Sequence, residues 1–144
     1  MTKKKPIIAI VDDDESVCRG MERLVRSLGL AAETYISGEN FLEQLESSAA
    51  ARPDCVILDV QMPGLDGIEV QQRIRRLHRT MPVIFITAHD DRAARNRAIA
   101  EGAVAVLRKP CNDALIMRTL QTALGLRPPG EPLDQGPIVS AKPD

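Results

Sequence analysis

Carboxylates end two apolar segments of this chain. Asp12 and Asp13 follow the segment 7–11, and Asp59 follows the segment 55–58. Short apolar segments rich in β-branched residues are typical of buried strands. Ligands of an open parallel sheet bind at the carboxyl ends of its strands, so we expect these three acids to share one site. Because crowded carboxylates repel one another, the sequence predicts a site for a hard cation or for phosphoryl chemistry.

Two other strand ends supply the remaining groups that such chemistry needs. Thr87 ends another apolar segment, and Lys109 follows a further one. Mg²⁺ prefers one or two carboxylates, a carbonyl and retained waters, and the Gln61 backbone carbonyl comes just past Asp59. Asp59 is then expected to act as a nucleophile toward phosphorus. Lys109 would hold one phosphoryl oxygen as a point charge, and the Thr87 hydroxyl would donate to another.

The hydrophobic pattern alternates between strands and helices. The expected strands are 7–11, 31–35, 55–58, 83–86 and 103–107. The expected helices carry the apolar positions 17–28, 41–45 and 68–77, the Ala- and Arg-rich segment 91–100, and the apolar positions 115–124. No hairpin signal separates the strands, which predicts a parallel sheet with helices on both faces. We therefore expect an α/β, flavodoxin-like doubly wound fold with five helices and the strand order 2-1-3-4-5.

One domain is expected over residues 5–125, followed by a Pro- and Gly-rich flexible tail over residues 126–144. The tail has no apolar period with which to bury a second core. A net charge of −1 and an aromatic content of 2% argue against direct binding to nucleic acid or to a membrane surface. No apolar segment is long enough for a signal peptide or a membrane span. These features predict a cytoplasmic protein.

The chain resembles the CheY-like receiver domain of two-component response regulators over roughly residues 5–125. The matching motifs are Val11-Asp12-Asp13, the run LDVQMPGLDG over residues 58–67, Ile86-Thr87-Ala88, Gly102-Ala103 and Lys109-Pro110. Each motif alone is common, whereas the whole set in this order and spacing is highly specific. The segments 12–15 and 87–89 look closest to the nitrogen-fixation-type regulators.

This resemblance implies that Asp59 accepts a phosphoryl group from a sensor histidine kinase or a phosphotransfer protein. It implies Mg²⁺ as the cofactor, held by Asp13, Asp59 and the Gln61 backbone carbonyl, with Asp12 acting through a metal-bound water. It also implies a cis peptide at Lys109-Pro110. Such a module catalyses only its own phosphorylation and dephosphorylation, and it signals by binding a downstream protein partner according to its phosphorylation state.

Two positions depart from the family pattern. Val106 and Cys111 stand where aromatic residues are usual, so signalling through a rotating aromatic ring is not expected. We expect the signal to pass instead from Thr87 to the helix after it. That helix carries several arginines, and the region 91–108 is a candidate surface for a homodimer or a partner.

Two other functions remain open. The chain could be the receiver half of a DNA-binding transcriptional regulator, with the Pro-rich tail as the start of an interdomain linker. It could also be an Asp-nucleophile phosphohydrolase of the haloacid dehalogenase type, with Asp12 and Asp14 as its motif. The phosphohydrolase is disfavoured because Asp59 and Lys109 would then have no role.

Overall fold

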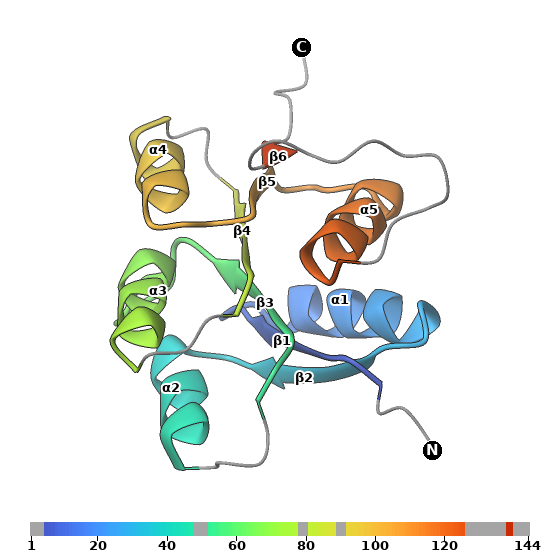
Figure 1. Cartoon of the computed structure of the whole chain (residues 1–144), viewed down its shortest axis with the longest axis horizontal. Helices are drawn as coiled ribbons and strands as arrows, with labels where there is room; N and C mark the ends of the chain where they lie inside the picture. The colour runs from blue at the N-terminus through green and yellow to red at the C-terminus, as the bar shows by residue number, and fades with distance from the viewer. Residues whose placement is uncertain (1–4, 48–51, 78–80, 89–91, 126–137, 140–144) are drawn as a thin grey trace.

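The computed structural model describes residues 5–47, 52–77, 81–88, 92–125 and 138–139. Strands and helices alternate along the chain, as the hydrophobic pattern predicts (Figure 1). The strands are β1 (Ile7–Val11), β2 (Ala31–Tyr35), β3 (Cys55–Asp59), β4 (Val83–Thr87), β5 (Ala105–Arg108) and β6 (Ile138–Val139). The helices are α1 (Glu15–Ser27), α2 (Gly38–Ser47), α3 (Gly67–Arg76), α4 (Arg92–Ala100) and α5 (Asp113–Ala123).

The strands form one parallel sheet in the order β2-β1-β3-β4-β5-β6. The predicted order of the first five strands is therefore confirmed. Helices α1 and α5 cover one face of the sheet, and α2, α3 and α4 cover the other (Figure 1). The strand order reverses between β1 and β3, where a doubly wound sheet places its ligand site.

The strand β6 is an addition to the predicted fold. It lies in the tail, for which the sequence predicted no secondary structure, and it pairs with β5. Two β-branched residues between Pro137 and Ser140 are too few to show the alternation by which a strand is recognised. The rest of the tail lies outside the described residues, as does the expected start of α4 at Asp91, so those predictions stay predictions.

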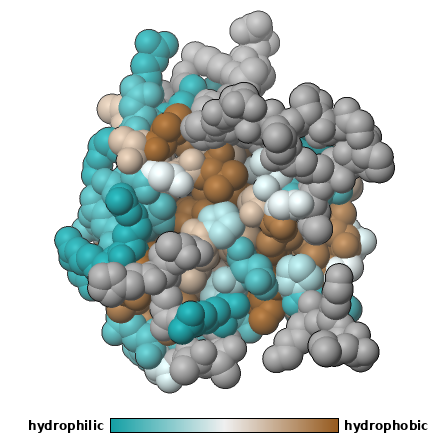
Figure 2. Space-filling model, viewed as in Figure 1, coloured by the Kyte–Doolittle hydropathy of each residue, from teal (hydrophilic) through white to brown (hydrophobic). Residues whose placement is uncertain are grey.

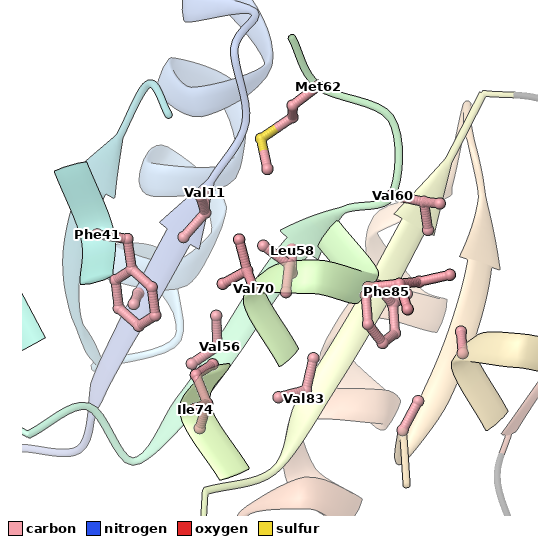
Figure 3. Close-up of a cluster of buried hydrophobic side chains, with 14 of the residues drawn as sticks. Val11, Phe41, Val56, Leu58, Val60, Met62, Val70, Ile74, Val83 and Phe85 are labelled. Carbon is pink, nitrogen blue, oxygen red and sulfur yellow. The ribbon is translucent and has the colours of Figure 1, made fainter. Parts of the chain in front are cut away.

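The core consists of two apolar clusters, one on each face of the sheet. On the side of α2, α3 and α4, Val11, Leu58 and Phe85 of the sheet lie with Phe41 and Val70 of the helices (Figure 3). The buried members of the second cluster are Ile8, Ile10, Cys18, Val25, Ala32, Cys55, Ile57, Ile84, Ile86, Ala105, Leu107, Ile116 and Leu120. The strands β3 and β4 are buried along their whole length, as is usual for a parallel sheet. In Figure 2, hydrophilic side chains cover the outer side over α3 and α4, and apolar ones gather toward the centre.

The helices begin at side-chain caps. Asp14 caps α1 and Asn112 caps α5, each through hydrogen bonds that its side chain accepts from backbone N–H groups. Asp66 and Glu69 form a capping box at the start of α3. Because a cap fixes the residue at which a helix begins, these side chains also set the lengths of the loops between strand ends and helices.

The strand β5 begins two residues later than predicted, at Ala105, and ends at Arg108. The backbone N–H of Ala103 donates to the carbonyl of Ala98 at 3.1 Å, so Ala103 closes the turn that ends α4. Gly102 has a φ of +96°, a backbone conformation that glycine adopts without a steric penalty. The apolar segment 103–107 therefore does not form a strand over its whole length. Its first residue belongs to the turn that ends α4, and the strand begins at Ala105.

Gly67 packs directly against the end of β3. Its backbone N–H donates to the carbonyl of Val60 at 2.8 Å, and a Cβ at this position would overlap the carbonyl oxygen of Asp59. The first residue of α3 thus lies in backbone contact with the residue predicted to be the nucleophile.

We predict that Gly67→Ala lowers the free energy of unfolding by about 1–3 kcal/mol, because the added methyl group forces α3 away from β3. Gly20→Ala is the matched control, since a Cβ at Gly20 in α1 would meet no atom within 4 Å. The control should raise the free energy of unfolding by roughly 0.5–1 kcal/mol through helix propensity. Urea unfolding measures both changes, and equal stability of Gly67→Ala and wild type would contradict the close packing.

Candidate functional site

The three predicted acids come together at one end of the sheet. Carboxylate oxygens of Asp12, Asp13 and Asp59 all lie within 4.8 Å of one another. Asp12 is 3% exposed and Asp59 is 6% exposed, whereas Asp13 is exposed to solvent. The arrangement therefore has two buried carboxylates at its base and one at its open side.

The register of the sheet brings the carboxylates at the ends of β1 and β3 close together. Val11 is the partner of Leu58 across β1 and β3, so the residues that follow them leave the sheet at the same level. Two hydrogen bonds from backbone N–H groups then orient the buried side chains. Asp12 Oδ1 accepts from the backbone N–H of Asp14 at 2.9 Å, and Asp59 Oδ1 accepts from the N–H of Gln61 at 3.2 Å. Each carboxylate is held by the loop that its own strand enters.

Lys109 supplies the positive charge within this group. Its Nζ lies 2.9 Å from Asp12 Oδ2 and 3.6 Å from Asp59 Oδ2. The backbone N–H of Lys109 donates to the carbonyl of Thr87 at 2.8 Å, which ties the end of β5 to the end of β4. The Lys109-Pro110 peptide is cis, as the resemblance implied. In this structure the lysine forms its shorter contact with Asp12, and the shorter contact was not foreseen from the sequence.

The electrostatics of the site leave negative charge in excess. Burial raises the pKa of Asp59 to about 6, and the negative charge of Asp12 adds to this effect, while Lys109 and the Gln61 N–H oppose it. Burial by itself lowers the pKa of Lys109, but its hydrogen bond with Asp12 and the charge of Asp59 outweigh burial and raise it. One lysine faces three carboxylates, so the site favours an additional cation.

Two predicted site residues lie beside the carboxylates. Thr87 is the last residue of β4 and is 4% exposed, and it follows Ile86, the partner of Asp59 in the sheet. Gln61 is exposed and lies two residues past Asp59 in the loop that carries the Asp59 hydrogen bond. The roles predicted for the Thr87 hydroxyl and the Gln61 carbonyl stay predictions.

A groove of about 570 Å³ adjoins Lys109, and it was not predicted from the sequence. It lies between α1 and the start of α5, and its lining residues are Val17, Gly20, Met21, Leu24, Ala88, Lys109, Pro110, Cys111, Asp113 and Ile116. Met21 and Leu24 belong to the apolar stripe of α1 but are only half-buried. The apolar stripe of α1 is wider than the area that the sheet covers. This width is the signal in the sequence that could have indicated the groove.

Cys111 lines the same groove, and its surroundings do not favour a reactive thiol. Its Sγ donates to the Arg108 carbonyl at 2.9 Å. Burial raises the pKa of Cys111 to about 11, against a smaller opposite effect of Lys109. A thiol that stays protonated at neutral pH is a poor nucleophile, so Cys111 acts here as a small packing residue.

Comparison with known proteins agrees with this geometry. The family model described as the response regulator receiver domain matches residues 8–121. The response regulator protein TodT of Pseudomonas putida is 37% identical over 128 residues, which are 89% of this chain and 55% of that protein. The DNA-binding transcriptional regulator NtrC of Escherichia coli is 38% identical over 107 residues, 74% of this chain and 22% of that protein. This chain thus spans about half the length of TodT and a smaller part of NtrC.

Solved structures give the same result. The crystal structure of a response regulator receiver protein from Burkholderia phymatum is 56% identical and superimposes with a TM-score of 0.78. The match covers 87% of this chain and 99% of that chain. Within the part of the chain that the structure describes, no helix is both long enough and apolar enough to span a bilayer. The sequence motifs, the strand order and the match over residues 8–121 lead to one conclusion: the chain belongs to the receiver domain family of two-component response regulators.

Proposed function

We propose that this receiver domain accepts a phosphoryl group on Asp59 in a Mg²⁺-dependent reaction. The donor is a sensor histidine kinase or a phosphotransfer protein, and the phosphorylated domain signals by binding a downstream protein. One observation carries the assignment of the site. The Asp59 carboxylate is buried at the carboxyl end of β3, beside Asp12 and Asp13, with the Lys109 ammonium 3.6 Å away.

Asp59 is the acid best placed to be the nucleophile. Asp12 is engaged with Lys109 at 2.9 Å, and Asp13 lies at the solvent-exposed side. The Gln61 N–H occupies Asp59 Oδ1, which leaves Oδ2 on the side of Lys109 to attack phosphorus. The raised pKa of Asp59 makes the ionised carboxylate more basic than an exposed aspartate, and a pKa of about 6 still keeps it ionised at neutral pH.

The donor atoms of the site fit Mg²⁺. All three side chains offer hard carboxylate oxygens within 4.8 Å of one another, and Asp13 lies on the exposed side where retained waters have room. Asp13, Asp59 and the Gln61 backbone carbonyl would hold the ion, and Asp12 would act through a bound water. When bound, Mg²⁺ supplies positive charge that offsets the charge of the phosphoryl oxygens.

The remaining residues position the phosphoryl group. Lys109 lies near both Asp12 and Asp59, so its ammonium can hold a phosphoryl oxygen on Asp59 without a large movement. The Thr87 hydroxyl, at the end of the next strand, would donate to another oxygen. Phosphoryl transfer is mainly positioning and charge stabilisation, and these groups supply both. The chemistry proposed is confined to phosphorylation and dephosphorylation of the domain itself, with no turnover of a separate substrate.

A second proposal concerns the output. The curated relatives extend well beyond the matched region, and one of them is a DNA-binding transcriptional regulator. The chain could therefore correspond to the receiver half of such a regulator, in which phosphorylation of Asp59 controls an output domain. The phosphohydrolase alternative requires Asp14 as part of its catalytic motif. The Asp14 side chain instead caps α1, where it accepts hydrogen bonds from the backbone N–H groups of Ser16 and Val17.

We predict that a small phosphodonor such as acetyl phosphate adds one phosphoryl group per chain when Mg²⁺ is present. Intact mass measures the product, and a chelator should abolish it. Asp59→Asn keeps the shape of the side chain and removes the nucleophile, so it should remain unlabelled. The exposed acid Asp113 provides the matched control, since Asp113→Asn should be labelled as fully as wild type. Full labelling of Asp59→Asn would show that another residue accepts the phosphoryl group.

We predict that Lys109→Ala lowers the free energy of unfolding in a chelator by about 1–3 kcal/mol, because buried carboxylates lose their counter-charge. Arg26→Ala, which breaks an exposed ion pair with Glu22, should cost less than about 1 kcal/mol. Beryllofluoride, a mimic of the phosphoryl group, should raise the melting temperature of Lys109→Ala less than that of wild type. An equal response would mean that Lys109 does not contact the phosphoryl group.

We predict that Asp59→Asn stabilises the metal-free protein at pH 7.5 by on the order of 1–3 kcal/mol. Folding raises the pKa of Asp59 from an ordinary 3.8 to about 6, so the ionised form is disfavoured in the folded state. The resulting penalty is present above pH 6 and disappears below the unfolded pKa, where the carboxyl is protonated in both states. Urea unfolding at pH 7.5 and at pH 3.5 checks the sign, and a stabilisation of the same size at both values would exclude this cause.

A further inference from the structure

The outer edge of β5 is occupied by a segment from the end of the chain. The strand β6 lies on the side of β5 opposite to β4 and runs parallel to it (Figure 1). The register pairs Ala105 with Ile138 and Val106 with Val139. In the part of the chain that the structure describes, β5 would be the edge of the sheet without this segment, with its outward backbone groups open to another strand.

The side chains of the first three residues of β5 are already buried, so this part of the edge offers mainly backbone groups. Ala105 and Leu107 belong to the cluster between the sheet and α1 and α5, and Val106 belongs to the cluster on the other face. All three are at most 1% exposed. A strand added at this edge therefore gains its affinity from main-chain hydrogen bonds, as in β-strand addition.

The covering segment is short, and its binding is therefore close to balance. A two-residue strand forms few hydrogen bonds, and their net stabilisation is comparable to the entropic cost of ordering its residues. Attachment to α5 through the intervening residues gives the segment an effective concentration on the order of millimolar. Such a segment can dock in its own chain and can still be displaced by a strand that forms more hydrogen bonds.

We propose that the edge of β5 is a strand-accepting interaction surface whose resident, displaceable occupant is the chain's own segment Ile138–Val139. The partner that fits this surface is a protein offering an extended segment that pairs in parallel with Ala105 and Val106. The C-terminal segment competes with such a partner and so sets a threshold for its binding. The competition does not require phosphorylation of Asp59, so it can be tested on the unphosphorylated chain.

Hydrogen exchange tests the docking. The double variant Ile138→Pro/Val139→Pro removes both backbone N–H groups of β6 from the full-length chain. We expect the amides of residues 105–108 that face β6 to lose protection about twofold, as a docking equilibrium close to balance requires, while the amides of β1 stay as in wild type. The matched control, Glu131→Pro/Asp134→Pro, places two prolines in the tail outside the strand and should leave the protection of β5 unchanged. Equal exchange of β5 in the two variants and wild type overturns the proposal.

A labelled peptide of residues 135–142 tests the competition. It should bind the full-length double variant about twofold more tightly than wild type, because in wild type the resident segment occupies the edge for part of the time. A peptide of the same composition with Ile and Val replaced by Pro is the control and should bind neither protein. Equal affinity for wild type and the variant, or no binding to either protein, overturns the proposal. Neither readout depends on the phosphorylation chemistry, so failure here leaves the proposed function intact.

Discussion

The crowding of three carboxylates at the carboxyl ends of β1 and β3 is the interaction on which the rest of this structure depends. Asp12 and Asp59 are almost fully buried, and their carboxylates repel each other. Without a tightly packed framework around them, this repulsion would move the two side chains apart. Lys109 relieves part of the repulsion through its 2.9 Å contact with Asp12. The remaining excess of negative charge favours the binding of a cation, which is the basis of the proposed Mg²⁺ site.

The apolar framework is what keeps the carboxylates in this position. The strands β3 and β4 are buried on both faces, so movement of either strand end would disturb one of the two clusters. Backbone contacts add to this restraint. Gly67 begins α3 against the carbonyl of Asp59, and the N–H of Lys109 donates to the carbonyl of Thr87. A change at the proposed phosphorylation site would therefore first affect the loops and helices attached to these strand ends.

The opposite edge of the sheet has a different energetic character. The site at the strand ends is fixed by buried side chains, whereas the docking of Ile138–Val139 on β5 depends on a few main-chain hydrogen bonds. The buried central strands and the weakly covered edge of β5 are therefore suited to different roles. The buried strands hold reacting groups at fixed distances, and the weakly covered edge suits a partner that must bind reversibly.

The sequence by itself determined the features that local chemistry controls. Alternating apolar segments predicted five strands and five helices, and acids that follow strands predicted a shared site. The tertiary structure decided which of several acids Lys109 contacts, where β5 begins, and that a groove adjoins Cys111. It also brought Ile138 beside Ala105, far apart in the chain. Periodicity and caps act over a few residues and are visible in a sequence, whereas these contacts follow from sheet register and packing among elements distant along the chain.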